Sequence, residues 1–209
     1  MPPRPRQTAS LSAILTTTSD ATLLRLPPGG VAWHKSETHI VFKGPEGQPV
    51  LSPLTAYGYV MADDALTRHQ TYHIHGAVGV DLDDGAAFIK HSSITQSLVA
   101  TIPPEPVELA GKAMISSIGK VQKVAFDNVN EDGEWQLTVQ AEHEIFNPED
   151  RKALHFPITY CFGYFSPGLS EMGDIEINTL MWFVGTVDSK DLVSNQLIVQ
   201  VLEYGIVGS

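Results

Sequence analysis

The feature that most constrains this chain is a series of short segments in which apolar and polar residues alternate. Residues 135–146 are the clearest case, because Trp135, Leu137, Val139 and Ala141 share one parity while mainly polar side chains occupy the other. A period of two is typical of a strand that buries one face and exposes the other. Similar segments recur along the chain, and together they predict an all-β protein.

Candidate strands occur in both halves of the chain, and turn-forming residues separate most of them. In the first half they are residues 38–43, 56–62, 71–81, 86–90 and 95–102. In the second half they are residues 112–117, 119–126, 135–146, 154–165, 175–187 and 196–207. This number of short strands favours an antiparallel β-barrel or a β-sandwich with little helix.

Two proline-rich segments mark the expected domain boundaries. Prolines near the amino terminus disfavour a helix in residues 1–10, which predicts a flexible arm. The sequence Pro103-Pro104-Glu105-Pro106 is the best internal boundary. We therefore expect an N-terminal β-rich segment over residues 11–102 and a β-barrel over residues 108–209, or one continuous domain over residues 11–209.

Charge and cysteine content limit the partners and the compartment. The chain has 209 residues with 24 acidic against 13 basic side chains, a formal net charge of −11. This charge opposes approach to nucleic acid or to an anionic membrane. No apolar run approaches the ~20 residues that a transmembrane helix needs. Cys161 is the only cysteine, so no intrachain disulfide can form. We expect a soluble, intracellular protein, cytoplasmic or nuclear, that does not engage a membrane.

The second half resembles an OB-fold barrel in the order of its strands. The segments similar to the five OB strands are residues 118–124 (Ile-Gly-Lys-Val-Gln-Lys-Val), 135–142, 155–162, 183–187 and 197–208. Many OB folds have a helix between the third and fourth strands, whereas residues 166–174 are few and poor in helix formers. The resemblance implies a five-stranded barrel in about half of the chain.

The resemblance also implies a ligand face. OB folds that bind oligonucleotides stack bases on aromatic side chains and contact phosphates with cations. The residues expected to form this face are Trp135, Tyr160, Tyr164, Trp182 and Lys120. The expected function is a non-enzymatic interaction protein that docks a partner protein or a single-stranded nucleic acid, and the acidic charge favours the protein partner.

Three histidines form a candidate site for a divalent metal. His73 and His75 share one face of the expected strand at residues 71–81, and His69 has the same parity. A His-x-His pair has the spacing of a two-ligand metal clip. The alternative is a polar outer face that binds no metal. No other cofactor is expected.

The sequence contains no motif of a known catalytic class. A nucleophile elbow, a P-loop and a dinucleotide-binding glycine motif are all absent. His143 has the opposite strand parity to its neighbours Glu142 and Glu144, and Cys161 lies in an apolar strand, so neither indicates catalysis. The sequence therefore favours a protein that is not an enzyme.

Two alternative functions remain open at this point. One is a small-molecule-binding barrel, such as an isomerase or cyclase, with a pocket lined by aromatic and polar residues that include Tyr59, His73 and His75. The other is a self-assembling, capsid-like β-sandwich that forms homo-oligomers. Its expected basic arm contains only Arg4 and Arg6, which disfavours genome packaging.

Overall fold

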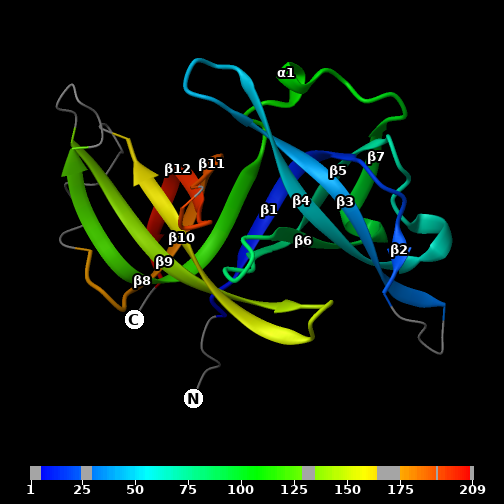
Figure 1. The fold of residues 1–209 in the computed structure, drawn as a ribbon. Coiled ribbons are helices and arrows are strands. Elements are labelled where there is room, and N and C mark those ends of the chain that lie inside the picture. Colours follow the sequence, from blue (N-terminus) through cyan, green and yellow to red (C-terminus); the bar gives the residue numbers. More distant parts are fainter. Residues whose placement is uncertain (1–5, 25–29, 129–134, 164–174, 192, 208–209) are drawn as a thin grey trace.

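Two β-barrels lie side by side and share one continuous sheet in the computed structural model (Figure 1). The structure describes residues 6–24, 30–128, 135–163, 175–191 and 193–207. The all-β architecture predicted from the alternating segments is confirmed. The β-sandwich alternative is wrong, because the strands close into barrels instead of forming two stacked sheets.

The first barrel is formed by strands from the first half of the chain. Its members are β1 (Ala9–Thr17), β3 (Val31–Lys43), β4 (Pro49–Met61), β5 (Thr71–Val80) and β6 (Ala87–Ser92). They pair in the closed order β1-β3-β4-β6-β5-β1. The β4–β6 pair is parallel and the other pairs are antiparallel. Short β2 (Thr22–Leu23) pairs with β3, and β7 (Gln96–Ala100) pairs with β5.

The second barrel repeats this pairing with strands from the second half. Its members are β8 (Met114–Asn128), β9 (Trp135–Asn147), β10 (Lys152–Phe162), β11 (Leu180–Lys190) and β12 (Leu197–Ile206). Their closed order is β8-β9-β10-β12-β11-β8, with β10–β12 as the parallel pair. This is the strand order of an OB fold, so the predicted resemblance is confirmed, and the first half has the same order.

Helices contribute little to the described part of the chain. The helical elements there are the short α1 (Pro106–Leu109) and the 3-10 turns η1 (Ala62–Asp64) and η2 (Ser93–Thr95). None of the helices within the described ranges is long and apolar enough to cross a membrane. The predicted boundary at residues 103–106 lies in the connection between β7 and β8, and therefore between the two barrels.

Strand β1 joins the two barrels because it pairs with a strand of each. Its residues Ser10–Thr16 pair with β5, and Ala9–Ser12 pair with β8. The residues before it continue into the second barrel, where the Thr8 carbonyl accepts a hydrogen bond from Ile118 N at 2.8 Å. The Gln7 carbonyl likewise accepts one from Glu144 N at 2.7 Å. The expected flexible arm over residues 1–10 is therefore too long, since the chain is already paired at Gln7; residues 1–5 lie outside the described part.

Several strand boundaries differ from those expected. Strand β3 begins at Val31 instead of residue 38, and β4 begins at Pro49 instead of residue 56. The expected segments 112–117 and 119–126 form the single strand β8, which has a register shift against β9 between Val121 and Lys123. Residues 164–174, where an OB helix would occur, lie outside the described residues.

Candidate functional site

The outer surface of β3 and β4 carries an aromatic pair in which Tyr59 is exposed and Trp33 is partly buried against the core. Trp33 lies opposite Tyr59 in the β3–β4 register, and their ring centroids are 5.3 Å apart with an angle of 47° between the rings. Tyr59 is 49% exposed and neighbouring Met61 is 48% exposed. We call Trp33, Tyr59 and Met61 the aromatic face. It lies on the second and third strands of the first barrel, the strands whose outer surface OB folds use for ligands.

Sequence reasoning missed Trp33 as a candidate functional residue. The signal was present, because Trp33 and Lys35 are two residues apart in β3, as Tyr57 and Tyr59 are in β4. The turn at residues 44–48 brings the two strands together in antiparallel register. The sequence placed Tyr59 only in the pocket of the small-molecule alternative.

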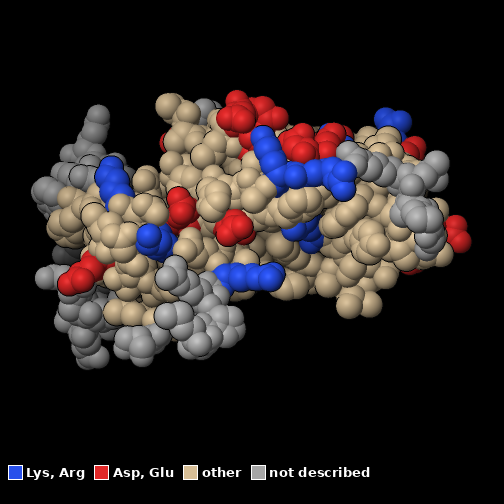
Figure 2. Space-filling view, turned by 90° about the horizontal axis from the view of Figure 1, so that it is seen from below, with Lys and Arg blue, Asp and Glu red and all other residues tan. Residues whose placement is uncertain are grey.

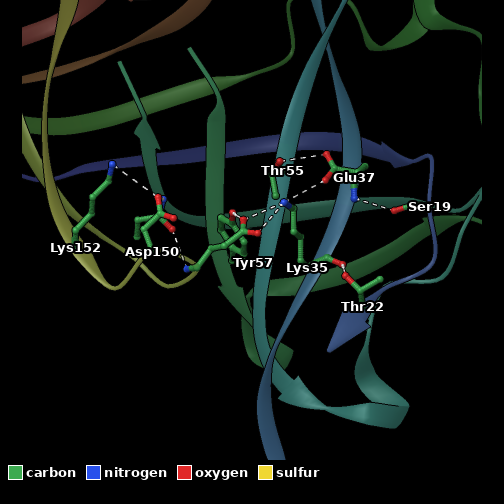
Figure 3. A network of polar contacts seen from close by, with 10 residues as sticks. Ser19, Thr22, Lys35, Glu37, Thr55, Tyr57, Asp150 and Lys152 are labelled. Atoms are coloured by element: carbon green, nitrogen blue, oxygen red, sulfur yellow. Dashed lines mark hydrogen bonds and ion pairs between the residues drawn. The ribbon is translucent and has the colours of Figure 1, made fainter. Parts of the chain in front are cut away.

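A polar network beside the aromatic face links the second barrel to the first (Figure 3). Lys35 Nζ donates to Glu149 Oε2 at 2.9 Å and to Oε1 at 3.2 Å, and the Tyr57 hydroxyl donates to the same carboxylate. Glu149 belongs to the turn between β9 and β10, which extends from the second barrel toward the first (Figure 1). The Glu149 carboxylate therefore neutralises Lys35.

The network shifts the pKa values of its members in consistent directions. The hydrogen bond from Tyr57 and the charge of Lys35 lower the pKa of Glu149, against a smaller opposing effect of burial. Burial and the hydrogen bond to Glu149 raise the pKa of Tyr57. Burial alone would lower the pKa of Lys35, but the contacts with Glu149 raise it overall. At neutral pH, Glu149 is therefore a carboxylate, Lys35 is an ammonium group, and the Tyr57 hydroxyl keeps its proton.

A second contact between the barrels involves Lys152 at the start of β10. Its Nζ lies 3.1 Å from Asp81 Oδ2 and 3.6 Å from Asp83 Oδ2, both in the β5–β6 turn. The same atom lies 3.8 Å from Asp150 Oδ2. Because Lys152 and Asp83 are largely exposed, we regard this contact as a weaker fastening than the one at Glu149.

Replacing Glu149 with glutamine is expected to loosen the attachment between the barrels. The amide keeps the shape of the side chain but removes the charge that holds Lys35 and Tyr57. We expect a loss of about 1 kcal/mol in the free energy of unfolding at pH 7, reduced from the buried-pair value because Glu149 is partly exposed. Urea unfolding measures this loss. The control Glu46→Gln, in the exposed β3–β4 turn, should change stability less, and equal effects of the two variants would contradict the prediction.

Tyr160, one of the residues expected on a ligand face, lies in the core of the second barrel. It is 0% exposed, and its ring stacks on Phe183 with centroids 3.9 Å apart. Its hydroxyl lies 2.6 Å from Ser117 Oγ and 3.1 Å from His143 Nε2. Because Tyr160 shares the inward parity of Phe162 on β10, it cannot stack on a ligand. Its assignment to a binding face is therefore corrected.

The other residues of the expected ligand face are only partly described. Trp182 and Lys120 are half-buried on the outer parity of β11 and β8, where Trp182 lies opposite Ile118. The Trp182 ring covers Gly205 of β12, where an added Cβ would lie 2.5 Å from its Nε1. Trp135 begins β9, but its side chain, like all of Tyr164, lies outside the described residues. A ligand role for these four residues stays a prediction.

The histidine cluster is only partly brought together. His73 and His75 are both exposed on the outer face of β5, as their parity predicted, and His73 Nε2 lies 2.8 Å from Ser12 Oγ. His69 lies in the preceding turn with a φ of 61°. Among the residues with described positions, no three His, Cys, Asp or Glu side chains are grouped to hold a metal. A divalent metal on His69, His73 and His75 stays a prediction.

The expected substrate pocket of Tyr59, His73 and His75 does not form inside a barrel. All three side chains are exposed on outer surfaces, on two strands that β6 separates. An apolar cavity between the two barrels, lined by residues that include Leu11, Ile40 and Val187, has a volume of about 10 Å³. That space holds no more than one water molecule. The small-molecule alternative therefore loses the pocket on which it depended.

Cys161 has the properties of a structural thiol. Its side chain is partly buried on β10, and burial together with the charge of Asp188 raises its pKa to about 11. A thiol with this pKa is almost entirely protonated at pH 7 and is a poor nucleophile.

Comparisons with known proteins identify the fold. No protein-family model matches this chain, and no curated protein matches it in sequence. The solved structures include the wild-type single-stranded DNA binding protein from Thermus aquaticus, with a TM-score of 0.54 and 12% identity over 98% of this chain and 95% of that one. A deletion mutant of the same protein has a TM-score of 0.55 and 15% identity over 98% and 96% of the two chains. At these identities the likeness shows the fold alone: this chain is an all-β protein built from OB-type barrels and similar over nearly its whole length to these structures.

Proposed function

We propose that this chain is a non-enzymatic protein that binds single-stranded nucleic acid by stacking bases on the aromatic face of its first barrel. The observation that carries the proposal is the Trp33–Tyr59 pair on β3 and β4, in which Tyr59 is 49% exposed and Trp33 is partly buried. Exposed aromatic rings on an OB-type barrel form a stacking platform, because every base offers a π face. The solved structures with the same overall fold are named single-stranded DNA binding proteins.

The acidic surface affects how such binding would work. Figure 2 shows basic side chains dispersed among acidic ones, with no continuous basic stripe on this face. Near the aromatic face, the carboxylate of Glu149 already neutralises Lys35. Few phosphates could then be neutralised, so affinity would come mainly from stacking. For single strands, the logarithm of the binding constant falls with the logarithm of salt concentration by about 0.7 for each phosphate contact. Because this chain would make few such contacts, we expect its affinity to depend less on salt than that of a strongly basic protein.

Replacing Tyr59 with alanine tests this proposal. The wild-type protein is expected to bind oligo-dT at low salt with quenching of tryptophan fluorescence. Loss of one stacking ring costs about 1–3 kcal/mol, so Tyr59→Ala should weaken binding by about fivefold to 150-fold. Tyr59 is half-exposed, so the variant should fold, and it retains all three tryptophans as reporters.

Two further results complete the test. The control Val107→Ala removes an exposed apolar side chain on α1, away from the aromatic face, and should bind oligo-dT like the wild type. Labelled oligo-dT followed by anisotropy checks the affinity independently of protein fluorescence. The absence of binding by the wild type at tens of micromolar would overturn the proposal and would favour a protein partner for the aromatic face.

A further inference from the structure

A cleft of about 520 Å³ lies where the two barrels meet, beside the chain segment that leads into β1. Its lining comes from residues 6–9, Ala77, Lys90, residues 144–146 and Ala153. The first barrel thus supplies one wall through β5 and β6, and the second barrel supplies the other through β9 and β10. The volume is in the range of small-molecule binding sites. The cleft shares no lining residue with the aromatic face.

Lys90 is the distinctive side chain of this cleft. It is half-buried on β6, and burial lowers the pKa of its ammonium group. Among the described residues it has neither a hydrogen bond through its side chain nor an ion pair. A cation that is partly removed from water without a counter-charge is unfavourable, and an anion bound beside it would offset that cost.

The charge of the cleft is positive although the chain is acidic. Lys90 and the exposed Arg6 supply two cations, and Glu144 supplies one carboxylate. The positive charge is therefore local, which favours a small anionic group over a long polyanion that would also meet the surrounding carboxylates.

The lining of the cleft is part polar and part apolar, and its apolar part includes an aromatic ring. Phe146 is 47% exposed at the end of β9, Ala153 lies opposite it in the β9–β10 register, and Ala77 adds apolar surface to the lining. Such a wall beside two cations matches a ligand with a flat apolar part and a phosphate. A nucleotide has both parts, since its base can lie on an aromatic ring and its phosphate can pair with Lys and Arg.

We propose that this inter-barrel cleft binds a nucleotide unit, with its phosphate on Lys90 and Arg6 and its base against Phe146. The proposal does not require that the aromatic face bind a strand. The nucleotide can be free or part of a single strand, because both present the same phosphate and base.

Calorimetric titration of the full chain with dTMP tests the proposal. We expect wild-type binding, and about tenfold weaker binding for Lys90→Gln, which removes the charge but keeps most of the length. Arg6→Gln should also weaken binding, and this exposed position cannot prevent folding. The control Lys112→Gln makes the same charge change at an exposed position outside the cleft and should bind like the wild type.

Additional binding measurements identify the ligand and distinguish this site from the aromatic face. Phe146→Ala should weaken the binding of dTMP more than that of inorganic phosphate, because only dTMP has a base. Competition of oligo-dT with dTMP would assign the site to a strand, and the absence of competition would assign it to a free nucleotide. Tyr59→Ala should leave dTMP binding unchanged, so failure of the aromatic face would be seen separately. No binding of dTMP at millimolar concentration, or equal binding by wild type, Lys90→Gln and Arg6→Gln, would overturn the proposal.

Discussion

Replacing Gly76 with alanine is expected to destabilise the first barrel strongly, because the added methyl group has no room. A Cβ at Gly76 of β5 would lie 1.7 Å from the carbonyl oxygen of Lys90 on β6. The obstacle is main chain instead of a flexible side chain, so β5 and β6 would have to separate. We expect a loss of at least about 3 kcal/mol, a large part of the ~5–15 kcal/mol that stabilises a typical domain.

Urea unfolding of Gly76→Ala against the wild type measures this effect. Gly163→Ala is the matched control, because the nearest atom to its added Cβ is the Gln200 side-chain nitrogen at 3.4 Å. This control should unfold at nearly the wild-type urea concentration. If Gly76→Ala did so too, the close crossing of β5 and β6 would be wrong. The displacement of Lys90 in this variant should also impair the inter-barrel cleft.

The second barrel was the more predictable half because its strands keep apolar residues inside. In β10, Phe156, Ile158, Tyr160 and Phe162 all point inward and are almost completely buried. The same parity could have placed Tyr160 in the core from the sequence. Its assignment to a ligand face rested on the aromatic character of the residue and disregarded its neighbours at positions two and four apart.

The start of β3 was not predictable by the same criterion because its pattern is inverted. His34, Ser36 and Thr38 point inward and are at most 8% exposed, while Trp33 and Lys35 point outward. The inward polar groups find partners in the backbone; for example, Thr38 Oγ1 donates to the Leu54 carbonyl at 2.5 Å. A strand with polar residues inside and an aromatic residue outside does not resemble a half-buried strand, so Trp33, the candidate binding residue on it, was missed as well.

The alternation of apolar and polar residues could not predict which strands pair to close each barrel. The closing parallel pairs are β4 with β6 and β10 with β12, and each pair is separated in sequence by another strand. Alternation shows which face of a strand is buried but not which strand lies beside it. For the second half the OB resemblance supplied the order, whereas nothing in the first half suggested it. The cleft could not be predicted for a similar reason, because it brings residues 6–9 together with strands of both barrels that are far apart in the sequence.

The net negative charge is a weaker argument against nucleic-acid binding once the fold is known. On the sequence alone it opposed nucleic acid as a partner, because basic residues are few and scattered. The two sites proposed above, the aromatic face and the locally positive cleft, would need little overall positive charge for binding. Stacking is less sensitive to the long-range field than phosphate contacts are. A weak salt dependence of binding is therefore the property that would distinguish this chain from a strongly basic nucleic-acid-binding protein.

Acid is expected to destabilise the protein below about pH 6.5 because two buried histidines resist protonation in the folded state. Burial lowers the pKa of His143 to about 4 and that of His91 to about 4, from an ordinary value of 6.5. Gly119 and Gly58 lie against these rings, since an added Cβ would lie 2.6 Å from His143 Nε2 or 2.7 Å from His91 Cε1. Neither ring has room for an additional solvating group.

The sign of the effect follows from which state binds the proton. Between pH 6.5 and 4 the unfolded chain protonates both histidines while the folded chain does not, so the free energy of unfolding falls as the pH falls. The loss approaches about 3 kcal/mol per histidine at pH 4. The lowered pKa of Glu149 acts in the same direction, but only as the pH falls below its ordinary value of 4.5.

Urea unfolding of wild type, His91→Gln, His143→Gln and the double variant, at pH 7.5 and at pH 5, separates these contributions. Glutamine remains neutral over this range, so each single variant should lose about half of the pH dependence and the double variant most of it. In His143→Gln the Tyr160 hydroxyl keeps its contact with Ser117, so the core retains a polar partner for it. An unchanged pH dependence in the double variant would mean that neither histidine is excluded from water, and the packing around Gly58 and Gly119 would then have to be looser than the structure shows.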